Sequence, residues 1–96
     1  MVDKGGYVYI LTNKPNGTLY IGVTGNLPQR IAQHRDGTFV GFSKTYGLKQ
    51  LVYFEHHEEI IAAIAREKRL KTWLRAWKIR LIVANNPDWR DLYGEL

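Results

Sequence analysis

Residues 7–23 read YVYILTNKPNGTLYIGV, and this stretch decides how the chain begins to fold. Its two ends, residues 7–11 and 19–23, are rich in β-branched and aromatic side chains, which favour strands. Between them, residues 13–18 combine a proline with an Asn-Gly pair, and both are typical of turns. The sequence therefore predicts a β-hairpin at the start of the chain.

A helix is expected directly after the hairpin. Asn26 is suited to cap its N-terminus and Pro28 to occupy its first turn. The helix is expected to run to Asp36, where Gly37 ends it. Residues 37–47 contain three glycines and predict a loop.

The second half of the chain predicts one more strand and two helical stretches. Residues 50–54 predict the strand, residues 58–72 a helix, and residues 73–84 a further helix after a break near residue 72. Residues 85–87, Asn-Asn-Pro, end it. The tail at residues 88–96 contains Trp89, Leu92 and Tyr93, which are expected to hold it against the body. The order ββαβαα predicts an α+β fold in which helices cover a small antiparallel or mixed sheet.

The amino-acid composition excludes several classes of protein. The chain has 96 residues, of which 45% are hydrophobic and 12% aromatic, so we expect a single domain with a real core rather than a disordered chain. It has no cysteine, which excludes disulfides, thiol nucleophiles and cysteine-bound metals and fits a reducing, cytoplasmic location. The longest apolar run, residues 60–65, is far too short for a membrane span, and the N-terminus has no apolar segment typical of a secretory signal.

The positive charge is concentrated in one segment. The formal net charge is +5, and residues 66–80 hold seven of the fourteen basic side chains with a single acid. These seven are Arg66, Lys68, Arg69, Lys71, Arg75, Lys78 and Arg80. Two interpretations stay open: a solvated helix face, or a surface that contacts the phosphates of a nucleic acid.

Two further groups of residues, on the predicted helices, are candidates for a site. Arg30 and His34 lie four apart, so they share a helix face beside the core. They are either site residues or amphipathic side chains whose polar ends reach water. Glu67 falls on the apolar stripe formed by residues 60, 64, 70 and 74, where it would either bind a divalent cation or pair with Lys71 or Arg66.

Aromatic and imidazole side chains on the strands give weaker signals. Tyr9 and Tyr20 of the hairpin are either site residues or ordinary strand residues. His56 and His57 are adjacent, so in a regular strand they point to opposite faces and cannot jointly bind a metal. We interpret these two as surface or strand-end residues.

Together, these residues resemble the GIY-YIG nuclease domain. Tyr20-Ile21-Gly22 matches the second triplet of that family, and Tyr7-Val8-Tyr9 resembles the first, with Tyr7 in place of Gly and Val8 in place of Ile. The spacing from Tyr9 to Tyr20, Arg30 and His34 also fits, as does a later glutamate on a helix, Glu67. The resemblance covers about residues 6–84, and the tail at residues 85–96 is similar to that of small stand-alone bacterial members.

The resemblance implies a three-stranded antiparallel sheet flanked by helices and a metal-dependent nuclease, with DNA the expected substrate. By position, Tyr9 and Tyr20 would orient or deprotonate the attacking water, Arg30 would hold the scissile phosphate and His34 would assist there. Glu67 would be the sole protein ligand of one Mg²⁺ or Mn²⁺, and either Asn85 or Asn86 is a candidate for the asparagine of the family. The lysine that some members carry after the second triplet is replaced by Val23.

The physical chemistry fits this implication. Mg²⁺ keeps several waters and needs only one or two carboxylates beside phosphate oxygens. A nearby Arg30 and a metal are expected to lower the pKa of a tyrosine by favouring phenolate. The alternative is a binding module that keeps the fold without cutting nucleic acid. Because one domain leaves little room for a recognition domain, three alternatives stay open: specificity for nucleic-acid structure or broken strands, specificity supplied by a protein partner, or none.

Overall fold

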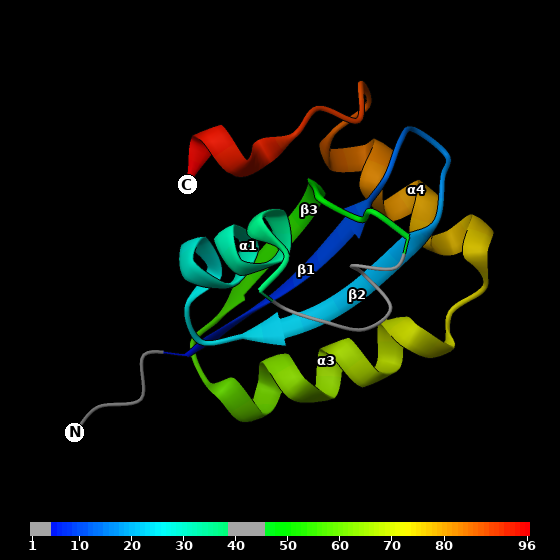
Figure 1. Ribbon diagram of the computed structural model, residues 1–96. Coiled ribbons are helices and arrows are strands. Elements are labelled where there is room, and N and C mark those ends of the chain that lie inside the picture. Colours follow the sequence, from blue (N-terminus) through cyan, green and yellow to red (C-terminus); the bar gives the residue numbers. More distant parts are fainter. Residues whose placement is uncertain (1–4, 39–45) are drawn as a thin grey trace.

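The computed structural model describes residues 5–38 and 46–96. Its strands β1 (Gly6–Thr12), β2 (Leu19–Thr24) and β3 (Gln50–His57) form one antiparallel sheet in the order β2-β1-β3. This confirms the predicted α+β fold, the order ββαβαα and the antiparallel choice (Figure 1). Of the predicted loop at residues 37–47, residues 39–45 lie outside the described residues.

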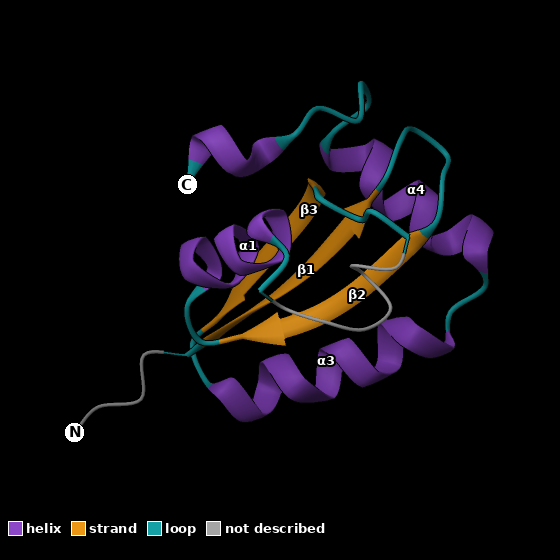
Figure 2. Cartoon of the chain, viewed as in Figure 1, coloured by secondary structure: helices purple, strands orange, loops and turns teal. Residues whose placement is uncertain are grey.

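Helices cover both faces of the sheet (Figure 2). On one face lie α1 (Leu27–Asp36) and the short 3-10 helix η1 (Leu92–Glu95); on the other lie α3 (Ile60–Thr72) and α4 (Arg75–Asn85). No helix in the described ranges is long and apolar enough to cross a membrane.

The ends of α1 lie where the sequence predicts them, for the predicted reason. The side chain of Asn26 accepts a hydrogen bond from the backbone N–H of Gln29, and Pro28 lies in the first turn. At the other end Gly37 has a φ of 81°, a left-handed conformation that favours glycine. These local signals fix the helix and, with it, the positions of Arg30 and His34.

The end of β3 differs from the sequence-based prediction, as do the starts of α3 and α4, at residues 60 and 75 instead of 58 and 73. The third strand continues past residue 54 to His57, and a bulge shifts its register against β1 between Ile10 and Leu11. The predicted break between the last two helices is confirmed at Trp73 and Leu74, whose backbones are extended. Because these two residues leave the helical conformation, α4 turns away from α3 toward β3.

The two faces of β1 build two hydrophobic clusters. Val8 and Ile10 point toward α3 and α4, whereas Tyr9 and Leu11 point toward α1, as the period of two in a strand requires. The tail is held as predicted, since Trp89 is buried in the first cluster. Leu92 and Tyr93 pack against the second cluster.

The predicted apolar stripe of α3 is partly wrong. Ile64 and Leu74 are exposed, and the buried residues of α3 are Ala63, Glu67 and Leu70. The helix is rotated because Ala63 and Leu70, at i and i+7, pack closely on β1 and β2. Glu67 at i+4 is therefore on the inner face, as the sequence predicts.

Candidate active site

Tyr9 is the centre of the candidate site. It lies on the central strand β1, is fully buried, and pairs across the sheet with Gly22 of β2. A Cβ at residue 22 would lie 2.4 Å from the Cζ and hydroxyl oxygen of Tyr9. The glycine of the second triplet is therefore needed for packing, because only a residue without a side chain leaves room for the phenol ring.

The hydroxyl of Tyr9 lies 3.0 Å from Nε2 of His34 on α1. Arg30, one turn earlier on α1, is close enough to this hydroxyl for its positive charge to act on the pKa of Tyr9. The buried phenol, the imidazole and the guanidinium therefore form one polar group between β1 and α1.

Burial keeps both partners of this hydrogen bond neutral. Desolvation lowers the pKa of His34 to about 4, and the positive charge of Arg30 acts in the same direction. Desolvation, and to a smaller extent the nearby Tyr20, raises the pKa of Tyr9 to about 12. Arg30 acts on the pKa of Tyr9 in the expected, lowering direction, but the pKa is raised overall because the cost of burying a phenolate exceeds the favourable effect of the guanidinium.

Tyr20 completes the aromatic group on this face. It lies on the edge strand β2, is only partly buried, and its ring centroid is 5.4 Å from that of His34 and 6.3 Å from that of Tyr9. Its edge position gives it more access to solvent than Tyr9 has. Of the two tyrosines, Tyr20 is therefore the better placed to contact a substrate.

Glu67 approaches this group from α3. Its side chain is on the buried face of the helix, and its negative charge acts on the hydroxyl of Tyr9. Its carboxylate also forms an ion pair with Lys71, at 2.6 Å. Both interpretations of Glu67 therefore find support: it faces inward toward the site, and it pairs with Lys71. Arg66 pairs with Glu55 of β3 instead.

The residues present fit a hard divalent cation held mainly by its substrate. The described residues contain no group of three or more acidic or histidine side chains that could hold a metal by themselves. A single carboxylate beside phosphate oxygens and waters is, however, an arrangement that Mg²⁺ accepts. Glu67 offers that carboxylate. The ammonium group of Lys71 would have to release one of the two carboxylate oxygens to the metal ion.

The seven basic residues of the predicted phosphate-contacting segment have different surroundings. Arg66 lies between Glu55 and the ring of Trp73, and Arg75 donates to the backbone carbonyls of Asn16 and Gly17. Lys78 reaches the carbonyl of Lys71. Lys68, Arg69 and Arg80 are exposed, and their side chains form no ion pair or hydrogen bond with the other described residues. These three are the better candidates for phosphate contacts, because the other four already contact groups of the protein.

The asparagines that end α4 have structural contacts. Asn86 is buried; its side-chain amide donates to the carbonyls of Val52 and Arg90, and its oxygen accepts from the backbone N–H of Arg90. Asn85 is exposed and donates to the carbonyl of Leu81. Because these bonds engage the amide of Asn86 fully, it holds the tail on β3 and is not available to a ligand.

The two histidines are the last residues of β3, and His56 is exposed, which confirms their interpretation as surface or strand-end residues. His56 contacts the ring of Tyr7, and His57 pairs with Glu55 on the opposite face. As predicted, they point apart.

Trp73 and Trp77 were not predicted as site residues from the sequence, although two tryptophans four residues apart within a basic segment are a visible signal.

The fold and the arrangement of these side chains are typical of a family of nuclease type. The chain belongs to the GIY-YIG family: the model of the GIY-YIG catalytic domain matches residues 5–80. Within that family the chain is similar to small proteins, most of whose length is covered by the match.

The relatives are UPF0213 proteins. The chain is 41% identical to one from Clostridium perfringens over 76 residues, which cover 79% of this chain and 81% of the relative. It is 35% identical to one from Pediococcus pentosaceus over 89 residues, which cover 93% of each. A solved structure, the solution NMR structure of a UPF0213 protein from Bacillus halodurans, superposes with a TM-score of 0.57 at 25% identity and covers 91% of this chain and 92% of that one.

Proposed function

We propose that the protein is a divalent-metal-dependent nuclease that hydrolyses phosphodiester bonds, with DNA as its substrate and Tyr9, Tyr20, Arg30, His34 and Glu67 as its active-site residues. The observation that carries this proposal is the meeting of these five side chains from four elements around one buried hydroxyl. Membership of a family of nuclease type supports it.

Arg30 is assigned to the scissile phosphate. Its planar guanidinium can bind two phosphate oxygens at once, and its place on α1, close to Tyr9, sets its position before the substrate arrives. The charge that develops on the phosphate is then met by a preorganised cation, which contributes more than one that must reorganise.

The two tyrosines have different roles. Tyr9 is fully buried and its pKa is about 12, so it remains protonated near neutral pH and positions both Arg30 and His34. Tyr20, at the edge of the sheet, orients the attacking water. His34, with its pKa near 4, is neutral and can accept a proton during the attack.

Glu67 would hold the metal ion, and the residues around it fit Mg²⁺ or Mn²⁺. When bound, such an ion neutralises negative charge on the phosphate and stabilises the leaving oxygen. Lys71, which pairs with Glu67, would move to a phosphate of the substrate.

A test compares Glu67→Gln with the matched variant Glu59→Gln. Glu59 precedes α3 and makes no side-chain capping bond, so its substitution removes one charge and no described contact. Labelled single-stranded, duplex, nicked and branched DNA and RNA are incubated with each protein in Mg²⁺, Mn²⁺ or EDTA. We expect cleavage that needs a divalent ion, is retained by Glu59→Gln and falls at least about 100-fold in Glu67→Gln. Equal cleavage by both variants would exclude Glu67 as the ligand.

The second candidate function is a binding module without cleavage. The observation that favours it is the ion pair between Glu67 and Lys71, which engages the expected metal ligand. Salt-sensitive binding by a protein that cuts none of these substrates with either metal would support this function.

A further inference from the structure

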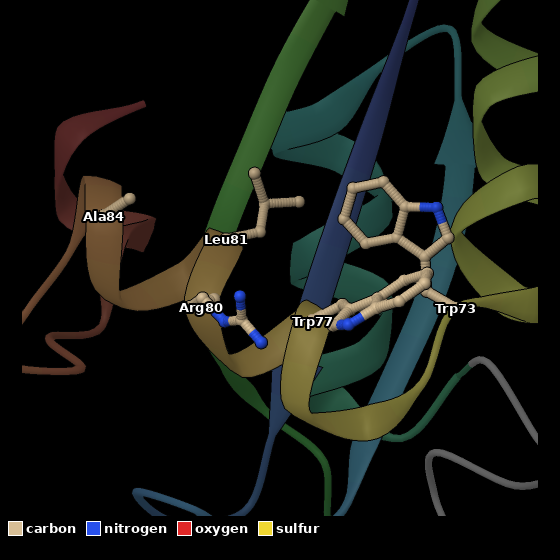
Figure 3. Close-up of a pocket in the computed structure, with 5 residues that line it drawn as sticks. All are labelled: Trp73, Trp77, Arg80, Leu81 and Ala84. Carbon is tan, nitrogen blue, oxygen red and sulfur yellow. The ribbon is translucent and has the colours of Figure 1, made fainter.

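An open depression lies on the face of the molecule away from α1. It has a volume of about 380 Å³ and is lined by Trp73, Trp77, Arg80, Leu81 and Ala84 (Figure 3). That volume is within the range of small-molecule sites. All of its lining residues come from α4 and the residue that begins the break before it, so the five residues of the candidate active site take no part in it.

The depression presents a fixed aromatic surface. Trp73 packs against the core, and the guanidinium of Arg66 lies 5.1 Å from its ring centre. The ring of Trp77 meets Trp73 almost at a right angle, with centroids 6.2 Å apart, yet 48% of Trp77 is exposed. The neighbouring ring thus holds the indole of Trp77 in place while leaving much of it open to a ligand.

The charge around this surface favours an anionic ligand. Residues 68–87 contain six basic side chains and no acidic one. Among the described residues the guanidinium of Arg80 has no hydrogen-bond or ion-pair partner, and it lies beside Trp77 at the depression. A ligand that matches both features has a flat ring for the indole and a negative group for the guanidinium.

We propose that this depression binds an unpaired nucleotide of a nucleic acid, with its base stacked on Trp77 and a flanking phosphate against Arg80. Base stacking on aromatic side chains and phosphate contacts from nearby cations are the two components of single-strand binding. The inference rests on the nucleic-acid substrate of the proposed function but not on cleavage. It names the substrate class: nucleic acid that contains a single-stranded segment.

Contacts along α3 connect the depression with the candidate active site. Lys71, which pairs with Glu67, precedes Trp73 by two residues, and the ammonium of Lys78 on α4 reaches the carbonyl of Lys71. A nucleic acid strand bound at both places would therefore have these two cations available to its phosphates.

The test measures binding in EDTA, so that no cutting occurs. Oligothymidylate and oligouridylate of about 12 nucleotides, and a duplex of the same length, are titrated against wild type, Trp77→Leu, Trp77→Phe, Arg80→Gln and Arg69→Gln. Arg69 is the matched control, since it is an exposed arginine outside the depression. Thermal unfolding of each variant checks that it is folded.

We expect Trp77→Leu to weaken single-strand binding roughly 10-fold or more and duplex binding by less than about 2-fold. Trp77→Phe should retain most of the affinity because it keeps a ring. Arg80→Gln should weaken single-strand binding more than Arg69→Gln does. The two oligonucleotides tell whether the site distinguishes DNA from RNA.

Three results would overturn the proposal: unchanged single-strand binding by folded Trp77→Leu, an equal loss on duplex, or equal effects of Arg80→Gln and Arg69→Gln. Stronger Trp77-dependent binding to an acidic peptide or to phosphatidylserine vesicles would also overturn it. Binding that depends on Trp77 in a protein without any cleavage would keep this inference and reject the proposed nuclease.

Discussion

The two faces of the same sheet differ in what they bury. Toward α3 and α4 the strands present aliphatic side chains such as Val8 and Ile10, whereas toward α1 the central strand presents Tyr9, which meets His34. The core of the first face is held by close packing of apolar groups. The second face buries polar groups, and each must find a partner or lose the free energy of its hydration. The comparison shows that the first face mainly stabilises the molecule, whereas the second holds most of the candidate active site, to which α3 adds Glu67.

The largest effect is expected at Tyr20 of the α1 face. Tyr20→Phe removes one hydroxyl and leaves the ring. If that hydroxyl orients the attacking water, cleavage should fall by about 100-fold or more, while binding stays near wild type. Steady-state cleavage and binding measured on the same labelled substrate check this result.

Tyr53→Phe is the control on the other face. The hydroxyl of Tyr53 donates to Glu55 and lies outside the candidate site. Its loss should cost stability of about 1 kcal/mol and leave cleavage unchanged. Equal, small effects of the two substitutions on cleavage would contradict a catalytic role for the hydroxyl of Tyr20.

A second test places a methyl group between the strands. In Gly22→Ala the added carbon overlaps the ring of Tyr9, which is fully buried and cannot swing outward. We expect the free energy of unfolding to fall by about 1–3 kcal/mol, together with a loss of cleavage because Tyr9 moves away from His34. Chemical denaturation measures the first and the nuclease assay the second.

Gly94→Ala serves as its control, since nothing lies within 4 Å of a Cβ at that position. That variant should unfold and cut as wild type does. A wild-type stability for Gly22→Ala would mean that the β1–β2 pair adjusts without strain.

Changes in pH should act in opposite directions on two polar groups of the α1 face. His34 has a folded pKa of about 4, below its ordinary value of 6.5, so the folded state loses stability as pH falls from about 6.5 toward 4. The pKa of Tyr9 is raised to about 12, so its contribution is present below pH 10 and is lost as pH rises from about 10 to 12.

Thermal unfolding across this range checks both directions. In His34→Gln the loss of stability between pH 6.5 and 4 should be smaller than in wild type. An unchanged acid profile in that variant would show that His34 is not the group that titrates.

The smallest effects are expected for two arginines on the α3 and α4 face, one whose side chain is bonded to the fold and one whose side chain is not. Arg69→Gln should leave stability unchanged and, if Arg69 contacts phosphate, make the logarithmic salt dependence of duplex binding shallower by about 0.9. Arg75→Gln loses its bonds to the carbonyls of Asn16 and Gly17 and should lower the melting temperature instead. Salt titrations and melting curves distinguish the two, and the reverse pattern would contradict the assignment.

Much of the fold was readable because its signals are local. The turn at residues 13–18, the cap at Asn26 and the stop at Gly37 act through neighbouring backbone groups, and the structure places each element where they predict it. The length of β3 was underestimated because its last residues are Glu55 and two histidines. These polar side chains are stabilised in the strand by contacts with Tyr7 and Arg66 that the local sequence does not reveal.

The sequence alone determined the order of elements, the pairing of the hairpin and the inward position of Glu67, because these follow from periodicity and short-range stereochemistry. Tertiary structure decided which partners the polar groups find. It brought Tyr9 to His34, 25 residues later in the chain, and its burial rather than Arg30 set the pKa of that tyrosine. It also engaged Asn86 in the tail and exposed Trp77, because desolvation and packing depend on neighbours that only the folded chain brings together.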